Sequence, residues 1–416
     1  FLQPVYWQVR GSITAPLVIG LFATAFLIVT AVILTRLLGF TRRREIALTC
    51  GLIAASETFA VSNATYLPWT DVYALALMLM AKFAMWNEDW NGALVPLQAL
   101  EELYGDFNEG NYPLAETQWR YKNPAESIFE IQHAWSLTGT QYNGNVAAIM
   151  MPTHNGDGVF DGVPLKGYGT SMPGWSSLRA NNRYAIFRPA TGNTQTENAA
   201  YVDALFNPLP LTYDTYDATL NRYTVKIDRE ALAAGEIRGQ KIDRRVQYFL
   251  GLGDLEAGET FKITHNYGVP WPGPKFWCPD IEQNYDSNNY RIFRYADAIL
   301  MMAECYCNLE NAEETMRYLN MVRQRAGVDP VTNFTGFEDL TLAVRCERAR
   351  ELGGEFQRKF DLVRWGIWYD QTYAYTNNAT LKGKMRPCHR YYPIPDAQCA
   401  LSGYVLTNDE YLADGL

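Results

Sequence analysis

The order of sequence patterns along the chain is the feature that most constrains its fold. Apolar residues recur at helical spacing in residues 70–104 and again from residue 291 onward. Between these regions, residues 105–290 are crowded with Gly, Pro, Asn and aromatic residues, which favour loops and turns. The middle stretch is too aromatic for a linker, so we expect an ordered lobe between two helical regions.

The first helical region matches the pattern of a helical hairpin. Asp71 can cap a helix over residues 72–85, whose apolar residues lie almost all round, so we expect deep burial. A polar turn over 87–92 leads to a return helix over 93–104. This arrangement is tetratricopeptide-like, and such a unit needs neighbours to bury its faces. We therefore predict a mainly α fold: helical hairpins from 1–104 and 291–416 form one platform, and 105–290 forms a loop-rich, irregular capping lobe.

The second helical region predicts helices over 295–309, 312–325 and 337–357, followed by a shorter helix that begins near Asp361. Two prolines hold residues 391–395 in an extended conformation. Within the middle lobe, short strand patterns occur at 223–227 and 245–250.

The N-terminal part contains a long uncharged run. No charged residue occurs from Gly11 to Thr35, and Arg42, Arg43 and Arg44 follow. By length and flanking charge, residues 16–38 satisfy the rule for a membrane-spanning helix. The alternative, which the rest of the chain favours, is that residues 13–60 form helices buried in a large helical core.

Composition excludes several classes of function. The net charge is −9 and the Lys and Arg residues are scattered, so no basic stripe for nucleic acid is expected. The seven Cys show no CxxC spacing and the four His are far apart, which gives no pattern for a metal site. We expect no metal, no cofactor and mostly buried cysteines.

Five motifs in the last third of the chain occupy residues 294–304, 318–327, 347–358, 361–365 and 392–395. In this order, over about 110 residues, they resemble the SusD/RagB family of outer-membrane nutrient-binding lipoproteins. A fainter resemblance extends to residues 70–104 and to 243–245.

The resemblance implies a protein outside the cell, tethered to the outer membrane by a lipidated N-terminal Cys. Such a protein would sit as a lid over a SusC-like TonB-dependent barrel, capturing oligosaccharide or peptide for import without catalysis. The expected lipid-bearing Cys is not near Phe1.

The charged residues of these motifs are interpreted as structural. Glu347, Glu351 and Glu355 recur every four residues and share one helix face, with Arg within helical reach. Such partners keep a carboxylate ionised, which disfavours the alternative of acid/base catalysis. We expect Asp297 and Glu304 to pair with Arg323 or Arg325. The predicted salt-bridge network consists of Asp297, Glu304, Arg323, Glu347, Arg348, Glu351, Glu355, Arg358, Asp361 and Arg364.

Aromatic residues in Gly- and Pro-rich surroundings of the middle lobe are the candidates for ligand contact. Stacking rings together with a few polar groups suit a neutral, extended oligomer. The candidate ligand-binding residues are Tyr168, Trp175, Asn181, Arg183, Trp271 and Trp277.

Two other functions stay open. A tetratricopeptide-type scaffold for partner proteins would use residues 16–38 as a membrane anchor. A glycoside hydrolase would need two acids across a cleft, such as Asp203 or Asp214 with Glu282, but the sequence gives no reason to pair them.

Overall fold

The computed structural model describes residues 69–134, 144–151, 285–376 and 379–415, with short segments between 154 and 281. The chain divides into two compact units, residues 1–76 and 77–416, and residues 69–76 are the described part of the first. The uncharged stretch at 16–38 and the helices expected over 13–60 lie outside the described residues. Among the helices that are described, none combines the length and the apolar character that a bilayer crossing requires.

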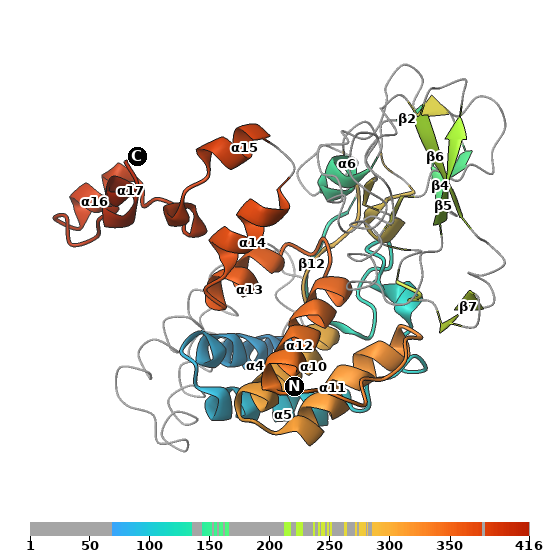
Figure 1. The fold of residues 1–416 in the computed structure, drawn as a ribbon, viewed down its shortest axis with the longest axis horizontal. Helices are drawn as coiled ribbons and strands as arrows, with labels where there is room; N and C mark the ends of the chain where they lie inside the picture. Colours follow the sequence, from blue (N-terminus) through green and yellow to red (C-terminus); the bar gives the residue numbers. More distant parts are fainter. Residues whose placement is uncertain are drawn as a thin grey trace, which may run out of the picture. The chain divides into compact units, whose positions relative to one another are not determined.

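Helices dominate the described residues, in agreement with the predicted mainly α fold (Figure 1). The longer helices are α4 (Trp69–Trp86), α5 (Trp90–Tyr104), α10 (Tyr295–Asn308), α11 (Ala312–Arg325) and α12 (Phe337–Glu351). The shorter helices are α6 (Val146–Met150), α13 (Arg358–Arg364), α14 (Trp368–Tyr375), α15 (Ala379–Lys384), α16 (Asp396–Leu401) and α17 (Asp409–Ala413). Single 3₁₀ turns are η1 (Leu114–Thr117), η2 (Pro274–Phe276) and η3 (Pro387–Arg390).

Helix α10 is the centre of the helical part. Its sequence is apolar on nearly every face, and all of its residues from Tyr295 to Cys305 are buried. Helices α5, α11 and α12 pack around it, so they cover it on several sides (Figure 1). A helix enclosed in this way must carry small or apolar side chains, and any charge on it needs a partner.

Local signals set where these helices begin. The Asp89 carboxylate accepts a hydrogen bond from the Gly92 amide at the start of α5, and Asn311 does the same for Glu314 at the start of α11. These bonds satisfy amides that a helix leaves without an intrahelical partner.

Two helix predictions need correction. Helix α4 begins at Trp69, so Asp71 lies inside it, and Phe83 is 69% exposed, so the helix is not buried all round. Helix α12 ends at Glu351 rather than at residue 357, because Gly354 adopts a left-handed conformation with φ +76°.

The described strands form six two-stranded antiparallel pairs. Two longer pairs are β1 (Ser127–Ile131) with β12 (Tyr290–Arg294), and β5 (Thr212–Asp217) with β6 (Arg222–Ile227). The shorter pairs are β2 (His154–Asn155) with β10 (Lys262–Ile263), β3 (Gly158–Phe160) with β4 (Val163–Leu165), β7 (Glu236–Ile237) with β8 (Gln240–Lys241), and β9 (Leu250–Gly251) with β11 (Trp271–Pro272). The strand expected over 223–227 is present in β6, whereas Arg245 lies in a turn instead of starting a strand.

The described part of the loop-rich stretch contains small aromatic cores. Trp119 is buried with its ring edge-on to Phe276 and Tyr290, at centroid distances of 5.0 Å and 5.2 Å. A second cluster packs Trp277 against α6, and the Asp286 carboxylate accepts the amide of Ala147 in that helix at 2.9 Å. Aromatic residues here provide core packing, which the small apolar content of the loops cannot supply alone.

Candidate functional site

The pairing of β1 with β12 brings acids and arginines together in a buried position. Glu130 and Arg291 lie opposite each other on the two strands, and the Glu130 Oε1 to Arg291 Nε distance is 2.7 Å. Both side chains are 1% exposed. Just before β1, Glu126 reaches Arg294 at the end of β12, again at 2.7 Å. The strand pair thus joins the loop-rich stretch to the segment that leads into α10.

Glu351 at the end of α12 is the centre of a buried ionic network. Its carboxylate pairs with Arg245 at 3.0 Å, with Arg294 at 2.6 Å and with Arg325. Glu126 bridges Arg294 and Arg325 from the other side, each at 2.7 Å. All five side chains are 3% exposed or less. Five segments distant in sequence are therefore held together at one point.

The network extends from Glu351 to the carboxylates four residues before and four residues after it, Glu347 and Glu355. Glu347 pairs with Arg245 at 2.7 Å, with Arg350 at 2.9 Å and with Arg323 at 3.1 Å. On the turn that follows α12, the Glu355 carboxylate pairs with Arg294 at 2.8 Å and with Lys275.

The carboxylates of this network are held ionised. Burial by itself raises the pKa of Glu351, but Arg325, Arg294 and Arg245 outweigh it, so the pKa lies well below its ordinary value. The pKa values of Glu347 and Glu355 are lowered in the same way, as their cations outweigh burial. Groups that stay ionised at neutral pH are unsuited to donating a proton in catalysis.

A second cluster surrounds Arg348 of α12. Arg348 pairs with Asp297 of α10 and with Asp361 of α13, both at 2.9 Å. Lys82 of α4 also reaches Asp297, at 2.7 Å. Burial raises the pKa of Asp297, yet Lys82 and Arg348 together bring it to about 2. This cluster links α4, α10, α12 and α13.

Several partners differ from those expected from sequence. Asp297 pairs with Lys82 and Arg348, not with Arg323 or Arg325. Glu304 pairs with Arg364, again with neither of the two expected arginines.

Arg348 and Arg358 also form fewer ion pairs with the nearby carboxylates of Glu347, Glu351 and Glu355 than the helical spacing suggests. Arg348 forms no ion pair with Glu347, Glu351 or Glu355 among the described residues, since its guanidinium points to Asp297 and Asp361. Arg358 donates a hydrogen bond to the Arg345 carbonyl at 3.1 Å and has no carboxylate partner within the described part of the chain. The reason is geometric: tertiary partners approach these side chains along directions that spacing within one helix does not reveal.

Sequence reasoning did not assign several members of the network. Arg245, Arg294 and Lys275 are buried cations and Glu126 is a buried acid, and all four lie outside α12. The available signal was local: a charged residue at each end of the short apolar strand β1, and an Asp-Arg-Arg sequence at 243–245. Neither signal indicates which distant residue is the partner.

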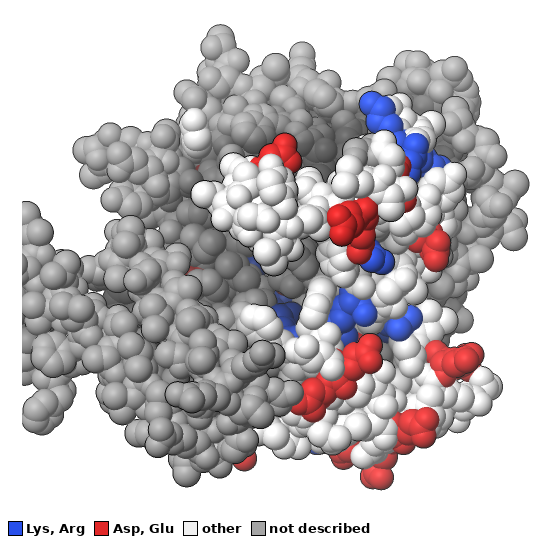
Figure 2. Space-filling view, turned by 90° about the vertical axis from the view of Figure 1, so that its left-hand side faces the viewer, with Lys and Arg blue, Asp and Glu red and all other residues white. Residues whose placement is uncertain are grey.

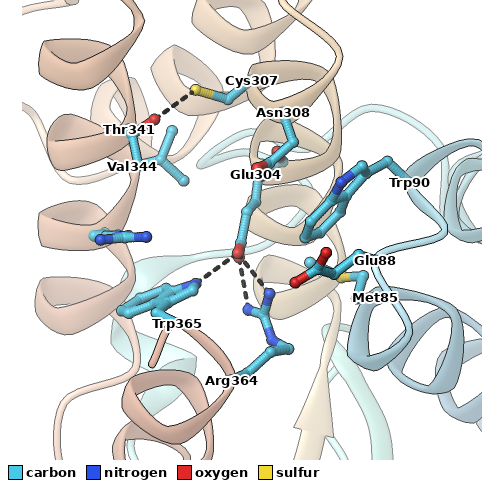
Figure 3. Close-up of a pocket in the computed structure, with 11 residues that line it drawn as sticks. Met85, Glu88, Trp90, Glu304, Cys307, Asn308, Thr341, Val344, Arg364 and Trp365 are labelled. Atoms are coloured by element: carbon cyan, nitrogen blue, oxygen red, sulfur yellow. Dashed lines mark hydrogen bonds and ion pairs between the residues drawn. The ribbon is translucent and has the colours of Figure 1, made fainter. Parts of the chain in front are cut away.

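A pocket lies beside the second cluster (Figure 3). Its volume is about 150 Å³, and its walls come from the turn between α4 and α5, from α10, from α12 and from the end of α13. Glu304 lies at its centre, and its two carboxylate oxygens accept from Arg364 at 2.6 Å and 2.8 Å. Trp365 Nε1 donates to the same carboxylate at 2.6 Å.

Only some of the candidate ligand-binding residues lie within the described part of the chain. Tyr168, Trp175, Asn181 and Arg183 lie outside the described residues. Trp271 is placed on strand β11, which pairs with β9, while its side chain is not described. The assignment of Trp277 fails, because its ring is 0% exposed and packs within the core cluster against α6. The ring therefore offers no face to a ligand.

The described surface carries charges of both signs. On the face drawn in Figure 2, acidic and basic side chains are interspersed over the described residues, without a broad basic area. Nucleic acid binding relies on such an area for its phosphate contacts.

Comparison with known proteins identifies relatives of the C-terminal part. A model of the SusD family matches residues 279–411. A SusD-like protein from Formosa agariphila is 34% identical over 150 residues, which cover 32% of this chain and 27% of that protein. The aligned part is therefore well under half of either protein.

Two solved structures show a distant similarity over more of the chain. Surface glycan-binding protein A from Bacteroides uniformis is 19% identical with a TM-score of 0.49, covering 89% of this chain and 69% of that one. Its counterpart from Bacteroides thetaiotaomicron, solved in complex with laminarihexaose, is 17% identical with a TM-score of 0.41, covering 80% and 63%.

All five motifs that predicted the family lie inside the matched segment, which also contains the central helices α10, α11 and α12. Residues 279–411 of this chain therefore match the model of the SusD family.

Proposed function

We propose that this chain is a cell-surface protein that binds an oligosaccharide and delivers it to a SusC-like TonB-dependent transporter, without catalysis. A peptide is the alternative ligand. The supporting observation is the SusD-family segment at residues 279–411, which forms the centre of the helical part. The protein would be lipid-anchored on the outer face of the outer membrane.

The chemistry of the buried carboxylates supports binding over catalysis. The carboxylates of α12 and of the turn after it, at Glu347, Glu351 and Glu355, are each held by at least two cations. A general acid must carry a proton near neutral pH, whereas these three carboxylates are ionised. Their evident effect is to fix helices to the loop-rich stretch, which gives a rigid base for binding loops.

We propose that the ligand contacts come from the lobe at residues 105–290. The candidates are Tyr168, Trp175, Asn181, Arg183 and Trp271. Aromatic rings stack on the flat faces of sugar rings, and amide or guanidinium groups hydrogen-bond to hydroxyls. The printed names of the two solved relatives, surface glycan-binding proteins, favour a glycan as the first ligand to test.

Binding of laminarihexaose, measured by isothermal titration calorimetry, tests this placement. Trp175→Ala and Trp271→Ala are expected to weaken binding about five-fold or more each, since stacking on an aromatic ring contributes roughly 1–3 kcal/mol. Trp86→Ala is the matched control, because Trp86 is 47% exposed at the end of α4 and outside the lobe. Equal affinity in all three variants would rule out the lobe assignment, and a panel of other oligosaccharides and peptides then identifies the ligand class.

Capture from gently solubilised outer membranes tests the partner. A TonB-dependent barrel recovered in near-equal amount is the expected result. Recovery without a barrel, together with fractionation in the inner membrane, would favour the scaffold anchored by residues 16–38.

A further inference from the structure

The pocket around Glu304 is lined by two acids, Glu88 and Glu304, and by two cations, Arg345 and Arg364. Arg364 pairs with Glu304, whereas Arg345 has no ion pair to any residue that the structure describes. Its walls come from residues 85–90 and from α10, α12 and α13, so it is separate in sequence from the lobe proposed for oligosaccharide binding. Figure 3 shows the ring of Trp90 on one side, Trp365 on the other, and the Glu304 side chain between them.

Glu304 is not a binding group for a ligand, because its carboxylate is already paired within the protein. Arg364 binds both of its oxygens, and the Trp365 indole donates a third hydrogen bond. Burial raises the pKa of Glu304, but these donors and Arg348 outweigh it, so the pKa is lowered and the group stays ionised. The carboxylate fixes the pocket floor and leaves the other charged groups of the pocket to act on a ligand.

Arg345 of α12 lines the same pocket without a carboxylate partner. Its guanidinium carbon lies 4.9 Å from the centre of the Trp365 ring, and it has no ion pair among the described residues. Its Nε is buried and makes no hydrogen bond to any of them.

The neighbourhood of Arg345 contains charges of both signs, since Glu88 and the paired Glu304 line the same pocket. Arg358 also lies over the Trp365 ring, at 5.2 Å, and also has no carboxylate partner among the described residues. Burial lowers the pKa of Arg345, and nearby Arg364 and Arg358 lower it further, while Glu304 acts in the opposite direction. A buried donor and an uncompensated charge are costly unless a partner arrives.

We propose that this pocket binds the carboxylate of a small molecule, with the guanidinium of Arg345 as its charged partner. A guanidinium presents parallel N–H groups that match the two oxygens of a carboxylate. The volume of about 150 Å³ limits the ligand to a single unit, such as one sugar acid or one amino acid. The Trp90 ring supplies a flat apolar wall, and Asn308 of α10 supplies an amide beside it.

Titration calorimetry with four ligands tests the chemistry. Glucuronate presents the carboxylate on a sugar ring, glutamate on a short chain, and acetate alone, whereas glucose has the ring without the carboxylate. Glucuronate or glutamate is expected to bind and acetate to compete with it, and the tighter of the first two identifies the source of the carboxylate. Glucose binding as tightly as glucuronate, or no binding by any carboxylate, would overturn the proposal.

Two matched variants test the residue. Arg345→Gln is expected to weaken carboxylate binding about ten-fold or more, the usual loss for a hydrogen bond to a charged group. Arg358→Gln removes a guanidinium that packs on the same ring but does not line the pocket, so it is expected to weaken carboxylate binding clearly less than Arg345→Gln does. Equal losses in both variants, or none in Arg345→Gln, would contradict the assignment.

A measurement on the wild-type chain keeps the test independent of variant folding. Saturating glucuronate or glutamate is expected to protect Arg345, and not Arg358, from modification by phenylglyoxal, as read by peptide mass spectrometry. An Arg345 that reacts at the same rate with and without ligand would refute the site. Because the lobe variants Trp175→Ala and Trp271→Ala leave this pocket intact, failure here is distinct from failure of oligosaccharide binding.

Discussion

Replacement of Glu351 by Gln is expected to destabilise the protein more than any exposed charge change. The carboxylate is 1% exposed and faces Arg245, Arg294 and Arg325. Glutamine keeps the shape but removes the negative charge, so three buried guanidiniums lose a shared partner. Removing one member of a buried ionic group costs about 3–5 kcal/mol, because the remaining charges stay buried without compensation. The whole free energy of unfolding of a domain is only about 5–15 kcal/mol.

The matched control for this prediction is Glu314→Gln on α11. Glu314 pairs with Arg317 at 2.8 Å, but the two side chains are 30% and 45% exposed. Solvent screens such a pair, so the expected cost is about 1 kcal/mol or less.

Urea unfolding followed by tryptophan fluorescence and far-UV circular dichroism gives both values. We expect a clearly lower midpoint for Glu351→Gln at an unchanged slope, and a nearly unchanged midpoint for Glu314→Gln. A loss below about 1 kcal/mol for Glu351→Gln would mean that the buried network contributes no more than an exposed pair, and would refute the reasoning.

Three further outcomes follow from particular contacts. Asp297 has a pKa of about 2 in the folded protein against 3.8 for the free group, because flanking cations outweigh its burial. Asp297 therefore contributes roughly 2 kcal/mol to the free energy of unfolding, present above about pH 5 and lost as the pH falls toward 2. Asp297→Asn should remove that part of the acid dependence of urea unfolding. An unchanged dependence on pH in the variant would argue against this contribution. Gly354→Ala should lower the melting temperature more than Gly366→Ala. Both glycines have a left-handed φ, but only at Gly354 would a new Cβ come within 2.6 Å of the Phe276 ring. Equal losses in melting temperature would show that the Phe276 ring moves aside without cost. Trp119→Ala should cost about 3–5 kcal/mol in urea unfolding, because the buried ring packs edge-on against Phe276, and a cost below 1 kcal/mol would contradict that packing.

The helical pattern of this protein could be obtained from its sequence because helix formation is largely local. The periodicity of apolar residues located α5, α10 and α11 to within a residue or so at most ends. The end of α12 was missed because it depends on a left-handed Gly354 that packs against Phe276, a contact between segments about 80 residues apart.

The charged residues of the network could be named from sequence, but their partners could not. Spacing within α12 placed Glu347 and Glu351 on one face, and that placement needs only the helix repeat. Which cations fill that face was decided by the β1–β12 pairing and by the approach of Arg245, since both bring distant segments together.

For the candidate sites too, the sequence gives the residue types and the tertiary structure decides their surroundings. An aromatic residue in a Gly- and Pro-rich stretch has the same sequence signature whether it lies open or in a core, and only the tertiary structure placed Trp277 in the core. The pocket of Arg345 left no sequence signal at all, because its walls come from four separate elements. The sequence by itself determined the family segment, the helices and the types of charge. The tertiary structure alone decided which charges are neutralised, because electrostatic pairing depends on distances between segments that the linear order does not encode.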